Sequence, residues 1–423
     1  MPVAIIGLAL LFFIGHALSW FFSKTKIPDL LILVIVGYTL GPILGVLKPS
    51  DFGAVGTIIS TLALIVILYE GGLNLSTRDL LSSSLPAAGI SILGFLITGI
   101  LGFLVVYGIA LQTWPVALII AIGIGSTSSA IVIPMVKFLS IQDKSKTILS
   151  LESAFTDVLT IVIFLVLVDG FSSGSIQLKD LAVGLGPNTL IAAVVGLFSA
   201  LTWAFIKKKF SHLIPNAFAG EAWALLTYGV LEASGLNGAI GTLTLGFMLA
   251  NLDLIPEWTK KLIHSDPISP KDMTLLKEIT FLLRTFFFVY LGILIQISNW
   301  KIIVLALLIC AVIFITRYFV VRALFKGSKY PRLDAMVITA MGPRGLACAV
   351  LATVPLQKGI EGGEFIRDTL FAVIPFSIIL TALFVSLSEK EKFRNKFEKL
   401  FRKYQEDEHT PTQNQELQID SPQ

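Results

Sequence analysis

The sequence is poor in charged residues. Only 14% of its 423 residues are Asp, Glu, Lys or Arg, whereas an ordinary soluble domain contains about 25%. A soluble chain of this length needs far more charged side chains to cover its surface. This deficit excludes a soluble multidomain enzyme, a nucleic-acid-binding protein and a disordered scaffold. Since 55% of the residues are hydrophobic, we predict an all-α polytopic membrane protein. We expect it to contact membrane lipids and to bind no nucleic acid.

Cysteine is also scarce. Cys310 and Cys348 both lie in apolar runs, so we expect no disulfide framework. The first apolar stretch, Val3 to Phe22, has no basic segment before it and no small-residue cleavage site, and we interpret it as a retained span. No nucleotide-binding loop, metal cluster or nucleophile–base pair stands out in the polar segments. The sequence therefore predicts neither an enzyme nor a resident cofactor.

The apolar windows give the number of membrane spans. One spanning helix needs about 20 apolar residues, and the polar breaks divide the chain into thirteen such segments. The weakest boundaries lie around 234–237 and in the amphipathic segment 254–273. The predicted spans cover residues 3–22, 28–47, 55–75, 85–111, 115–138, 147–168, 187–206, 218–234, 236–253, 274–297, 301–325, 333–355 and 365–388.

The positions of Lys and Arg predict the orientation, because positive residues favour the cytoplasmic side of a membrane. With an odd number of spans and the N-terminus outside, nearly all basic residues lie on the inner side. The exceptions are Lys48, Lys179, Lys301, Lys358 and Arg367. The inner tail begins with a basic segment, 389–404, which is either an amphipathic helix on the inner leaflet or a stop-transfer anchor. Residues 405–423 are polar and predicted to be disordered.

The sixth predicted span contains the clearest candidate site. An ionisable side chain in mid-span costs at least about 2.5–3.5 kcal/mol on insertion scales, so it indicates function. A spacing of four residues stacks Glu152 over Thr156 and Ser153 over Asp157. One helix face thus carries two carboxylates and two hydroxyls, which suit a hard monovalent cation or a proton. The alternative is a buried ion pair with an arginine, which we favour more for Glu152 than for Asp157.

Two other predicted spans are interrupted near their middle. The fifth contains Gly123-Ile124-Gly125-Ser126-Thr127-Ser128-Ser129, and the twelfth contains Met341-Gly342-Pro343-Arg344-Gly345. Such residues weaken helices. Paired interrupted helices in the two halves of a chain indicate an inverted-repeat transporter, whose half-helix ends offer partial charges to a substrate.

Further charges lie within other spans. Glu70 is placed near the cytoplasmic end of the third span. It is either an accessory acidic residue in a funnel or an interfacial carboxylate near Arg78. Arg317 lies too deep to reach the membrane surface easily, so we expect it to have a carboxylate partner.

Four motifs, taken in this order, resemble those of the monovalent cation:proton antiporters over about residues 1–388. The motifs are Tyr69-Glu70-Gly71-Gly72-Leu73, Glu152-Ser153-x-x-Thr156-Asp157, Phe286-Phe287-Phe288-Val289-Tyr290-Leu291-Gly292 and Gly342-Pro343-Arg344-Gly345. The resemblance implies an elevator transporter in the cell membrane, with crossed, partly unwound helices at spans five and twelve. It implies a mobile core of spans 85–168 and 301–388, a scaffold of spans 3–75 and 187–297 that forms a homodimer, and a cytoplasmic tail at 389–423.

The resemblance also implies roles for single residues. Asp157 matches the aspartate that binds the cation and the proton, and Ser153 matches a hydroxyl ligand. Glu152 matches a structural glutamate whose partner is either Arg317 or Arg344. Glu70 matches an accessory acidic residue.

Two positions depart from the family pattern. Thr156 replaces the Asn or Asp that precedes the key aspartate in many members. The fifth span has Thr127-Ser128-Ser129 in place of Thr-Asp-Pro, which is similar to the potassium-efflux branch. We include Thr156, Thr127 and Ser128 in the predicted cation site, and both Na⁺ and K⁺ remain candidates for the transported ion.

These observations predict a secondary transporter that exchanges one monovalent cation for one proton. A single uncompensated carboxylate, Asp157, holds either ligand but not both, so competition couples the two fluxes without net charge movement. The alternative is a cation-coupled organic-solute symporter of similar fold. A channel and an intramembrane aspartyl protease are disfavoured, because there is no selectivity-filter motif and no second mid-membrane aspartate.

Overall fold

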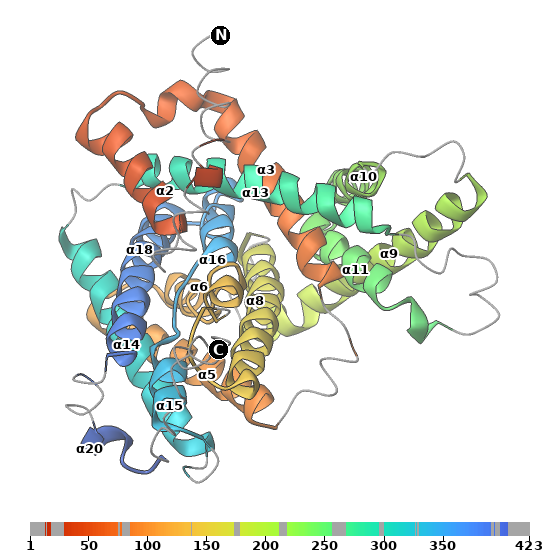
Figure 1. Ribbon diagram of the computed structural model, residues 1–423. Helices are drawn as coiled ribbons and strands as arrows, with labels where there is room; N and C mark the ends of the chain where they lie inside the picture. Colours follow the sequence, from red (N-terminus) through yellow and green to blue (C-terminus); the bar gives the residue numbers. More distant parts are fainter. Residues whose placement is uncertain are drawn as a thin grey trace, which may run out of the picture.

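The computed structural model is built from helices (Figure 1). It describes residues 13, 15–17, 29–74, 77, 85–136, 138–172, 178–210, 218–255, 268–295, 300–325, 327, 330–390, 393 and 398–404. All regular elements of these residues are helical, as the composition predicts. The long helices are α2 (Asp29–Tyr38), α3 (Pro49–Leu73), α5 (Leu85–Leu104), α8 (Asp143–Ser172), α9 (Leu178–Lys209), α10 (Ala219–Ala233), α11 (Gly238–Ala250), α13 (Pro270–Leu294), α14 (Trp300–Leu324) and α18 (Gly363–Ser388).

The fifth and twelfth predicted spans are interrupted in the structure. The fifth consists of α6 (Trp114–Gly123) and α7 (Ser129–Val136). The twelfth consists of α15 (Arg332–Ala340), α16 (Leu346–Leu351) and α17 (Val354–Gln357). Short π-helical or 3₁₀ turns, η1 (Thr39–Ile43), η2 (Val105–Ile109) and η3 (Leu252–Leu254), end three of the others. The non-helical backbone thus falls where Gly, Ser and Pro gather in the sequence.

Membrane-spanning character is clear for part of the described chain. Five helices are long and apolar enough to cross a bilayer, and five shorter apolar helices of 10–17 residues accompany them. The first predicted span, 3–22, lies almost entirely outside the described residues. The total of thirteen spans therefore stays a prediction.

Several helices extend beyond the apolar windows that predicted them. α13 begins at Pro270, where the Ser269 hydroxyl accepts a hydrogen bond from the Asp272 amide and the Asp272 carboxylate accepts one from the Ser269 amide. This capping box, with Pro at the first helical position, fixes the helix start. Lys207 of α9 forms an ion pair with Asp272. Burial tends to raise the pKa of Asp272, but the hydrogen bonds from Lys207 and Ser269 outweigh it and hold that pKa below its ordinary value.

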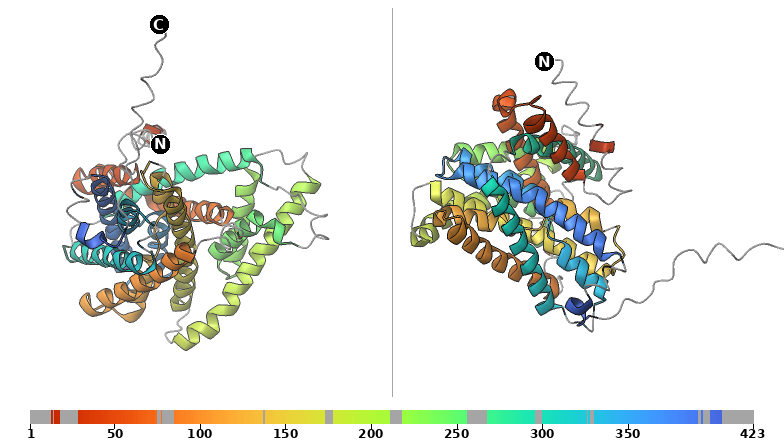
Figure 2. Two further views of the ribbon diagram at one scale, coloured as in Figure 1. Left: turned by 60° about the horizontal axis from the view of Figure 1, so that its bottom comes forward. Right: turned by 90° about the vertical axis from the view of Figure 1, so that its left-hand side faces the viewer.

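The helices pack as two groups (Figures 1 and 2). We call α5–α8 together with α14–α18 the site group, and α2, α3, α9, α10, α11 and α13 the flanking group. Each helix packs mainly within its own group, for example α14 against α18 and α5, or α11 against α3 and α9. Between the groups, the main packing is limited to α16 against α3, α18 against α2, and α8 against α9 and α11.

Glycines allow two close helix crossings in the flanking group. A Cβ at Gly72 would lie 2.3 Å from a backbone oxygen of α11, and a Cβ at Gly246 would lie 2.4 Å from a backbone oxygen of α3. Gly37 of α2 and Gly292 of α13 meet in the same reciprocal way. Small residues let helix backbones approach within membranes. Two of the sequence motifs therefore contain glycines that set helix packing.

An ionic cluster joins the two groups at one end. Lys358, which follows α17, lies 3.9 Å from an Asp169 carboxylate oxygen of α8 and 3.6 Å from a Glu232 carboxylate oxygen of α10. Asn237, the N-cap of α11, donates a hydrogen bond to Asp169. Glu232 accepts a hydrogen bond from the Gly238 amide. This Lys358 cluster thus links α8 and α17 of the site group to α10 and α11 of the flanking group.

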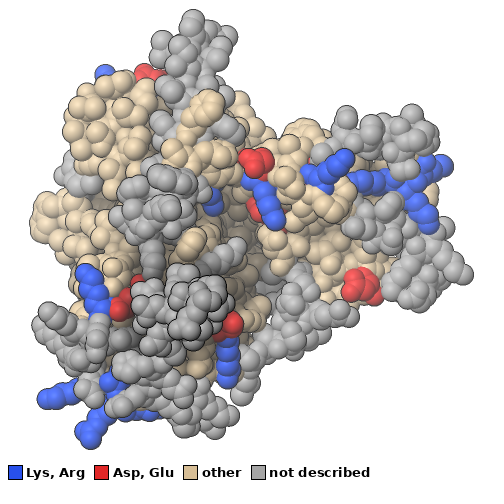
Figure 3. All heavy atoms as spheres, viewed as in Figure 1, with Lys and Arg blue, Asp and Glu red and all other residues tan. Residues whose placement is uncertain are grey.

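The described part of the tail packs on the protein. Phe401, which ends α20 (Glu398–Phe401), and Tyr404 are both buried. The Tyr404 hydroxyl donates to the Val321 carbonyl at 3.2 Å, and the Tyr318 hydroxyl donates to the Leu400 carbonyl at 3.3 Å. The Phe401 ring also packs against the Tyr318 ring of α14, so the described end of the tail is anchored on α14. Elsewhere, the described part of the face in Figure 3 is mostly uncharged.

Candidate functional site

The two interrupted segments meet inside the site group. The Ser128 amide, just before α7, donates a hydrogen bond to the Pro343 carbonyl at 2.9 Å. A Cβ at Gly345 would lie 2.1 Å from the Ser128 hydroxyl oxygen, so only glycine permits this contact. The Arg344 amide donates to the Ser377 hydroxyl of α18 at 2.9 Å. Partners from other segments thus satisfy backbone groups that the interruptions leave unbonded, as buried non-helical backbone requires.

α8 lies against this junction and is fixed at its start by α15. The Asp334 carboxylate of α15 accepts hydrogen bonds from the Gln142 amide at 3.2 Å and from the Ser145 hydroxyl at 2.6 Å. Farther along α8, the Thr156 hydroxyl accepts a hydrogen bond from the Thr127 amide at 3.1 Å and donates to the Glu152 carbonyl. These contacts hold the polar face of α8 against the interrupted fifth span.

Glu152 is fully paired. The Arg317 guanidinium of α14 donates from Nη1 to one carboxylate oxygen at 2.5 Å and from Nη2 to the other at 3.0 Å. Arg317 also donates to the Ile338 carbonyl, and the Thr127 hydroxyl donates to Glu152. Both charged side chains are buried. Of the two arginines that the sequence left open, Arg317 is the one that forms the ion pair, with the bidentate geometry typical of strong pairs.

Arg344 has a different environment. Its Nη1 lies 3.4 Å from the Thr127 hydroxyl and 3.3 Å from the Gly342 carbonyl, and its side chain is buried. Arg344 therefore contacts the backbone of its own interruption and a hydroxyl of the other one, and it makes no described hydrogen bond to Glu152.

Asp157 is held by the start of α7. One of its carboxylate oxygens accepts hydrogen bonds from the Ser129 amide at 3.1 Å and from the Ser129 hydroxyl at 2.7 Å. A carboxylate at a helix N-terminus interacts favourably with the helix dipole. The other oxygen, Oδ1, is buried and has no hydrogen-bond partner in the described part of the chain. One oxygen is thus positioned by Ser129, and the second has no donor among the described residues.

Ser129 was missed as a site residue, although it lies in the interrupted segment. The predicted hydroxyl ligands have other contacts. Ser153 donates to the Ser150 carbonyl at 3.0 Å, Thr127 contacts Glu152 and the two arginines, and the Ser128 amide binds Pro343. Sequence spacing shows which hydroxyls share a helix face, but the contact between α7 and α8 determines which one reaches Asp157.

Glu70 lies on α3 in the flanking group. It interacts electrostatically with Arg284 and Lys277, which are both on α13. Arg78, the neighbour that the sequence suggested, lies outside the described residues.

The sequence matches the family "sodium/hydrogen exchanger, transmembrane" over residues 7–387. It is 27% identical to Na⁺/H⁺ antiporter 1 of Methanocaldococcus jannaschii over 85% of this chain and 84% of that protein. It is 22% identical to the K⁺/H⁺ antiporter NhaP of Alkalimonas amylolytica and 26% identical to the K⁺/H⁺ antiporter NhaP2 of Shewanella sp. strain ANA-3, over 91% and 88% of this chain. The chain spans only about two thirds of the length of these two potassium antiporters, 66% and 64%.

The fold resembles a solved structure of the same family. The sodium proton antiporter MjNhaP1 from M. jannaschii at pH 8 matches with a TM-score of 0.71 at 23% identity, over 92% of this chain and 98% of that one. Together with the long apolar helices, these matches confirm an integral, multi-pass membrane protein. Because the sequence matches the sodium/hydrogen exchanger family over residues 7–387, which is most of the chain, this protein belongs to that family.

Proposed function

We propose that the protein exchanges a monovalent cation for protons across the membrane, and that both bind at Asp157. The observation that carries this proposal is the buried, unpartnered Oδ1 of Asp157 beside two interrupted helices. A buried carboxylate oxygen without a partner is costly, and a cation or a proton removes that cost. The names of the relatives, which are all antiporters, support the same activity.

We propose an electroneutral exchange of one cation for one proton. Arg317 forms an ion pair with Glu152, so Asp157 is the carboxylate on this face of α8 that has no ion-pair partner among the described residues. Asp157 is neutral with either ligand bound, so the loaded site carries the same charge in both directions. Competition for one carboxylate then links the two fluxes.

The proposed alternating access is an elevator movement of the site group against the flanking group. Its support is the packing, which is extensive within each group and limited between them. In this proposal the site group is the mobile core, with crossed interrupted helices, and the flanking group is the scaffold. The Lys358 cluster, which joins the groups at one end, must open when they move.

The ion and the assembly are further parts of the proposal. Both a sodium and a potassium antiporter are among the relatives, so Na⁺ and K⁺ are the proposed cations. Asp157 is the proposed charged ligand, and the proposed further ligands are hydroxyls of Ser153, Thr156, Thr127, Ser128 or Ser129. Glu70 is proposed as an accessory acidic residue. The proposed assembly is a homodimer formed by the flanking group, which crosslinking in native membranes tests.

Proteoliposomes with an internal pH dye test the activity. Addition of NaCl or KCl to one side is expected to move protons to that side. In the sodium experiment, the initial rate of proton movement is expected to stay the same when valinomycin and potassium set a membrane voltage. A rate that follows the voltage would contradict the 1:1 exchange. Cation movement that requires an organic solute and moves no protons would instead establish the symporter.

A further inference from the structure

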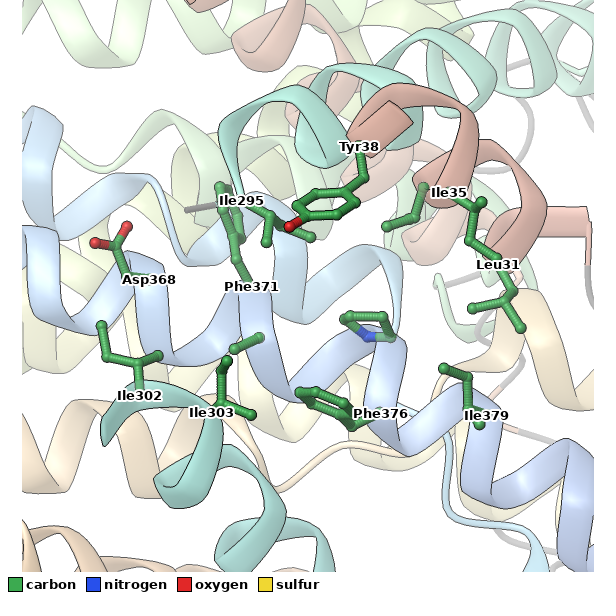
Figure 4. Close-up of a pocket in the computed structure, with 13 residues that line it drawn as sticks. Leu31, Ile35, Tyr38, Ile295, Ile302, Ile303, Asp368, Phe371, Phe376 and Ile379 are labelled. Carbon is green, nitrogen blue, oxygen red and sulfur yellow. The ribbon is translucent and has the colours of Figure 1, made fainter. Parts of the chain in front are cut away.

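Two cavities of the protein differ in what lines them. A groove of about 170 Å³ between α2 and α18 is almost entirely apolar, with Leu31 and Ile35 on one side and Phe376 and Ile379 on the other (Figure 4). A much smaller cavity lies within the flanking group, where the ends of α3 and α9 meet the starts of α10 and α13. Charged and hydroxyl groups line the smaller cavity, so its chemistry can specify a ligand.

Each of the four helices contributes one such group to the smaller cavity. They are Tyr69 of α3, Lys207 of α9, Glu221 of α10 and Asp272 of α13. The predicted orientation places these four helix ends on the cytoplasmic side. No residue of α8 lines this cavity, so it is separate from the Asp157 site.

Only one of the two carboxylates at this cavity is paired. Asp272 forms an ion pair with Lys207. Glu221 is buried, and its Oε2 accepts no hydrogen bond within the described part of the chain. It also lies in the first turn of α10, where the helix dipole favours a negative charge. Two carboxylates and one ammonium group therefore leave one negative charge at the cavity.

A hydroxyl stands beside these charges. Tyr69 is buried and interacts electrostatically with Glu221 and Asp272. A Cβ at Gly220 would lie only 3.1 Å from the Tyr69 hydroxyl oxygen, so this hydroxyl lies close to the first turn of α10. Carboxylate and hydroxyl oxygens are the ligands that hard cations prefer.

The size and charge of the cavity restrict the ligand. Its volume is about 10 Å³, which is about the room that one water molecule needs. An organic cation or a hydrated ion is too large for it, whereas a single dehydrated ion is not. A monovalent cation balances the one negative charge, and a divalent cation would leave an excess positive charge in a buried place.

We propose that this cavity binds one dehydrated monovalent cation, Na⁺ or K⁺, at the Glu221 carboxylate, with the Tyr69 hydroxyl as a further ligand. The cation ties the inner ends of four helices of the flanking group together, so it stabilises that group. This inference goes beyond the proposed transport function, since the site shares no residue with the one at Asp157.

Melting curves test the site in a protein whose proposed transport site is removed. The full-length Asp157→Asn variant is melted in detergent at pH 8 in NaCl, KCl or choline chloride of equal ionic strength. Because a ligand of the folded state stabilises it, saturating Na⁺ or K⁺ is expected to raise the melting temperature by about 2 °C or more above choline. The salt that acts at the lower concentration identifies the preferred ion. Equal melting in all three salts would overturn the proposal.

A second substitution assigns the effect to Glu221. Asp157→Asn combined with Glu221→Gln is expected to melt at the same temperature in all three salts, and a retained shift would place the cation elsewhere. The matched control adds Glu278→Gln instead, since Glu278 lies on α13, is 56% exposed and does not line the cavity. This control is expected to keep the full shift. The comparison depends on Glu221 alone, so its result stands whether or not Asp157 is the transport site.

Two further measurements separate a cation from other occupants. Tyr69→Phe, again with Asp157→Asn, keeps the ring but removes the hydroxyl, and is expected to raise the half-saturating cation concentration at least threefold. An unchanged concentration would refute the ligand role of Tyr69. A melting temperature that rises on acidification from pH 8 to pH 6 but does not respond to Na⁺ or K⁺ would overturn the cation site in favour of a proton on Glu221.

Discussion

Two carboxylates on α8, only five residues apart, have opposite surroundings. Both carboxylate oxygens of Glu152 accept hydrogen bonds from Arg317, so this carboxylate has no free oxygen for a transported ion. At the Asp157 level, Ser129 holds one oxygen while Oδ1 has no hydrogen-bond partner among the described residues. Burial alone therefore does not identify a transport residue. In the proposed mechanism, the state of the second carboxylate oxygen distinguishes the structural acid Glu152 from the transport residue Asp157.

The largest expected effect comes from changing the open carboxylate. Asp157→Asn removes the charge that binds the cation and the group that exchanges the proton, so cation-driven proton movement in proteoliposomes is expected to fall to that of empty vesicles. The melting temperature is expected to stay unchanged, because no cationic side chain in the described part of the chain donates a hydrogen bond to Asp157. Exchange that persists in this variant would place the transport site elsewhere.

Breaking the closed pair is expected to affect stability instead. Glu152→Gln leaves the buried Arg317 charge without its partner, which costs about 3–5 kcal/mol and is measured as a large fall in melting temperature in detergent. The double variant Glu152→Leu with Arg317→Met removes both charges and is expected to melt higher than Glu152→Gln, since apolar replacement of a buried pair is often neutral or stabilising. If Glu152→Gln melts like the unmodified protein, the pair does not stabilise the fold.

A smaller effect is expected at the residue that holds Asp157. Ser129→Ala removes a hydrogen bond to the charged form of the carboxylate, so protons compete more strongly with the cation. Half-maximal exchange is expected to move up by about one pH unit, because hydrogen bonds to charged groups contribute about 1.5–3 kcal/mol and one unit corresponds to 1.36 kcal/mol. Thr160→Val on α8 is the control, since the only hydrogen bond of the Thr160 hydroxyl within the described residues is a 3.5 Å contact to the Ile122 carbonyl. An unmoved pH profile in Ser129→Ala would exclude this role.

The smallest effect is expected at a third carboxylate, which lies at the start of α13. Asp272 has a lowered pKa in the folded protein, so its contribution to stability is present above the ordinary pKa of about 3.9 and is lost as the pH falls through the lowered value. Asp272→Asn is expected to cost about 1 kcal/mol or less at pH 7, because the pair with Lys207 is partly exposed. Melting curves of the two proteins are expected to converge only below about pH 4. A difference that persists in acid would show that the capping box, and not the charge, matters.

Sequence patterns predicted the features that depend on one helix. The four-residue spacings from Glu152 to Thr156 and from Ser153 to Asp157 placed both carboxylates on one face of α8. The clusters of Gly, Ser and Pro located both interruptions. The apolar windows located the helices but not their ends, because hydropathy does not detect polar helical extensions. The start of α13 had its own signal, the Ser269, Pro270 and Asp272 capping pattern, which the hydropathy analysis did not use.

Features that depend on contacts between helices were not predictable in the same way. The sequence required an arginine near Glu152 but left Arg317 and Arg344 open, since nothing in one sequence specifies that Arg317 of α14 faces α8. Ser129 was missed for the same reason. Its role follows from the direction in which α7 leaves the interruption, and a run of four hydroxyl residues, 126–129, does not show which of them will point at Asp157.

The docked tail offers a labelling position outside the helix bundle that reports on the movement of α14. Tyr404 binds the Val321 carbonyl near the end of α14, and the same helix carries Arg317, the partner of Glu152. A dye attached at the exposed position of Arg402, between the buried Phe401 and Tyr404, is therefore coupled to the helix that anchors the buried ion pair, without any label inside the membrane. Paired with a second dye on the flanking group, it converts a displacement between the two helix groups into an optical signal that can be followed during turnover.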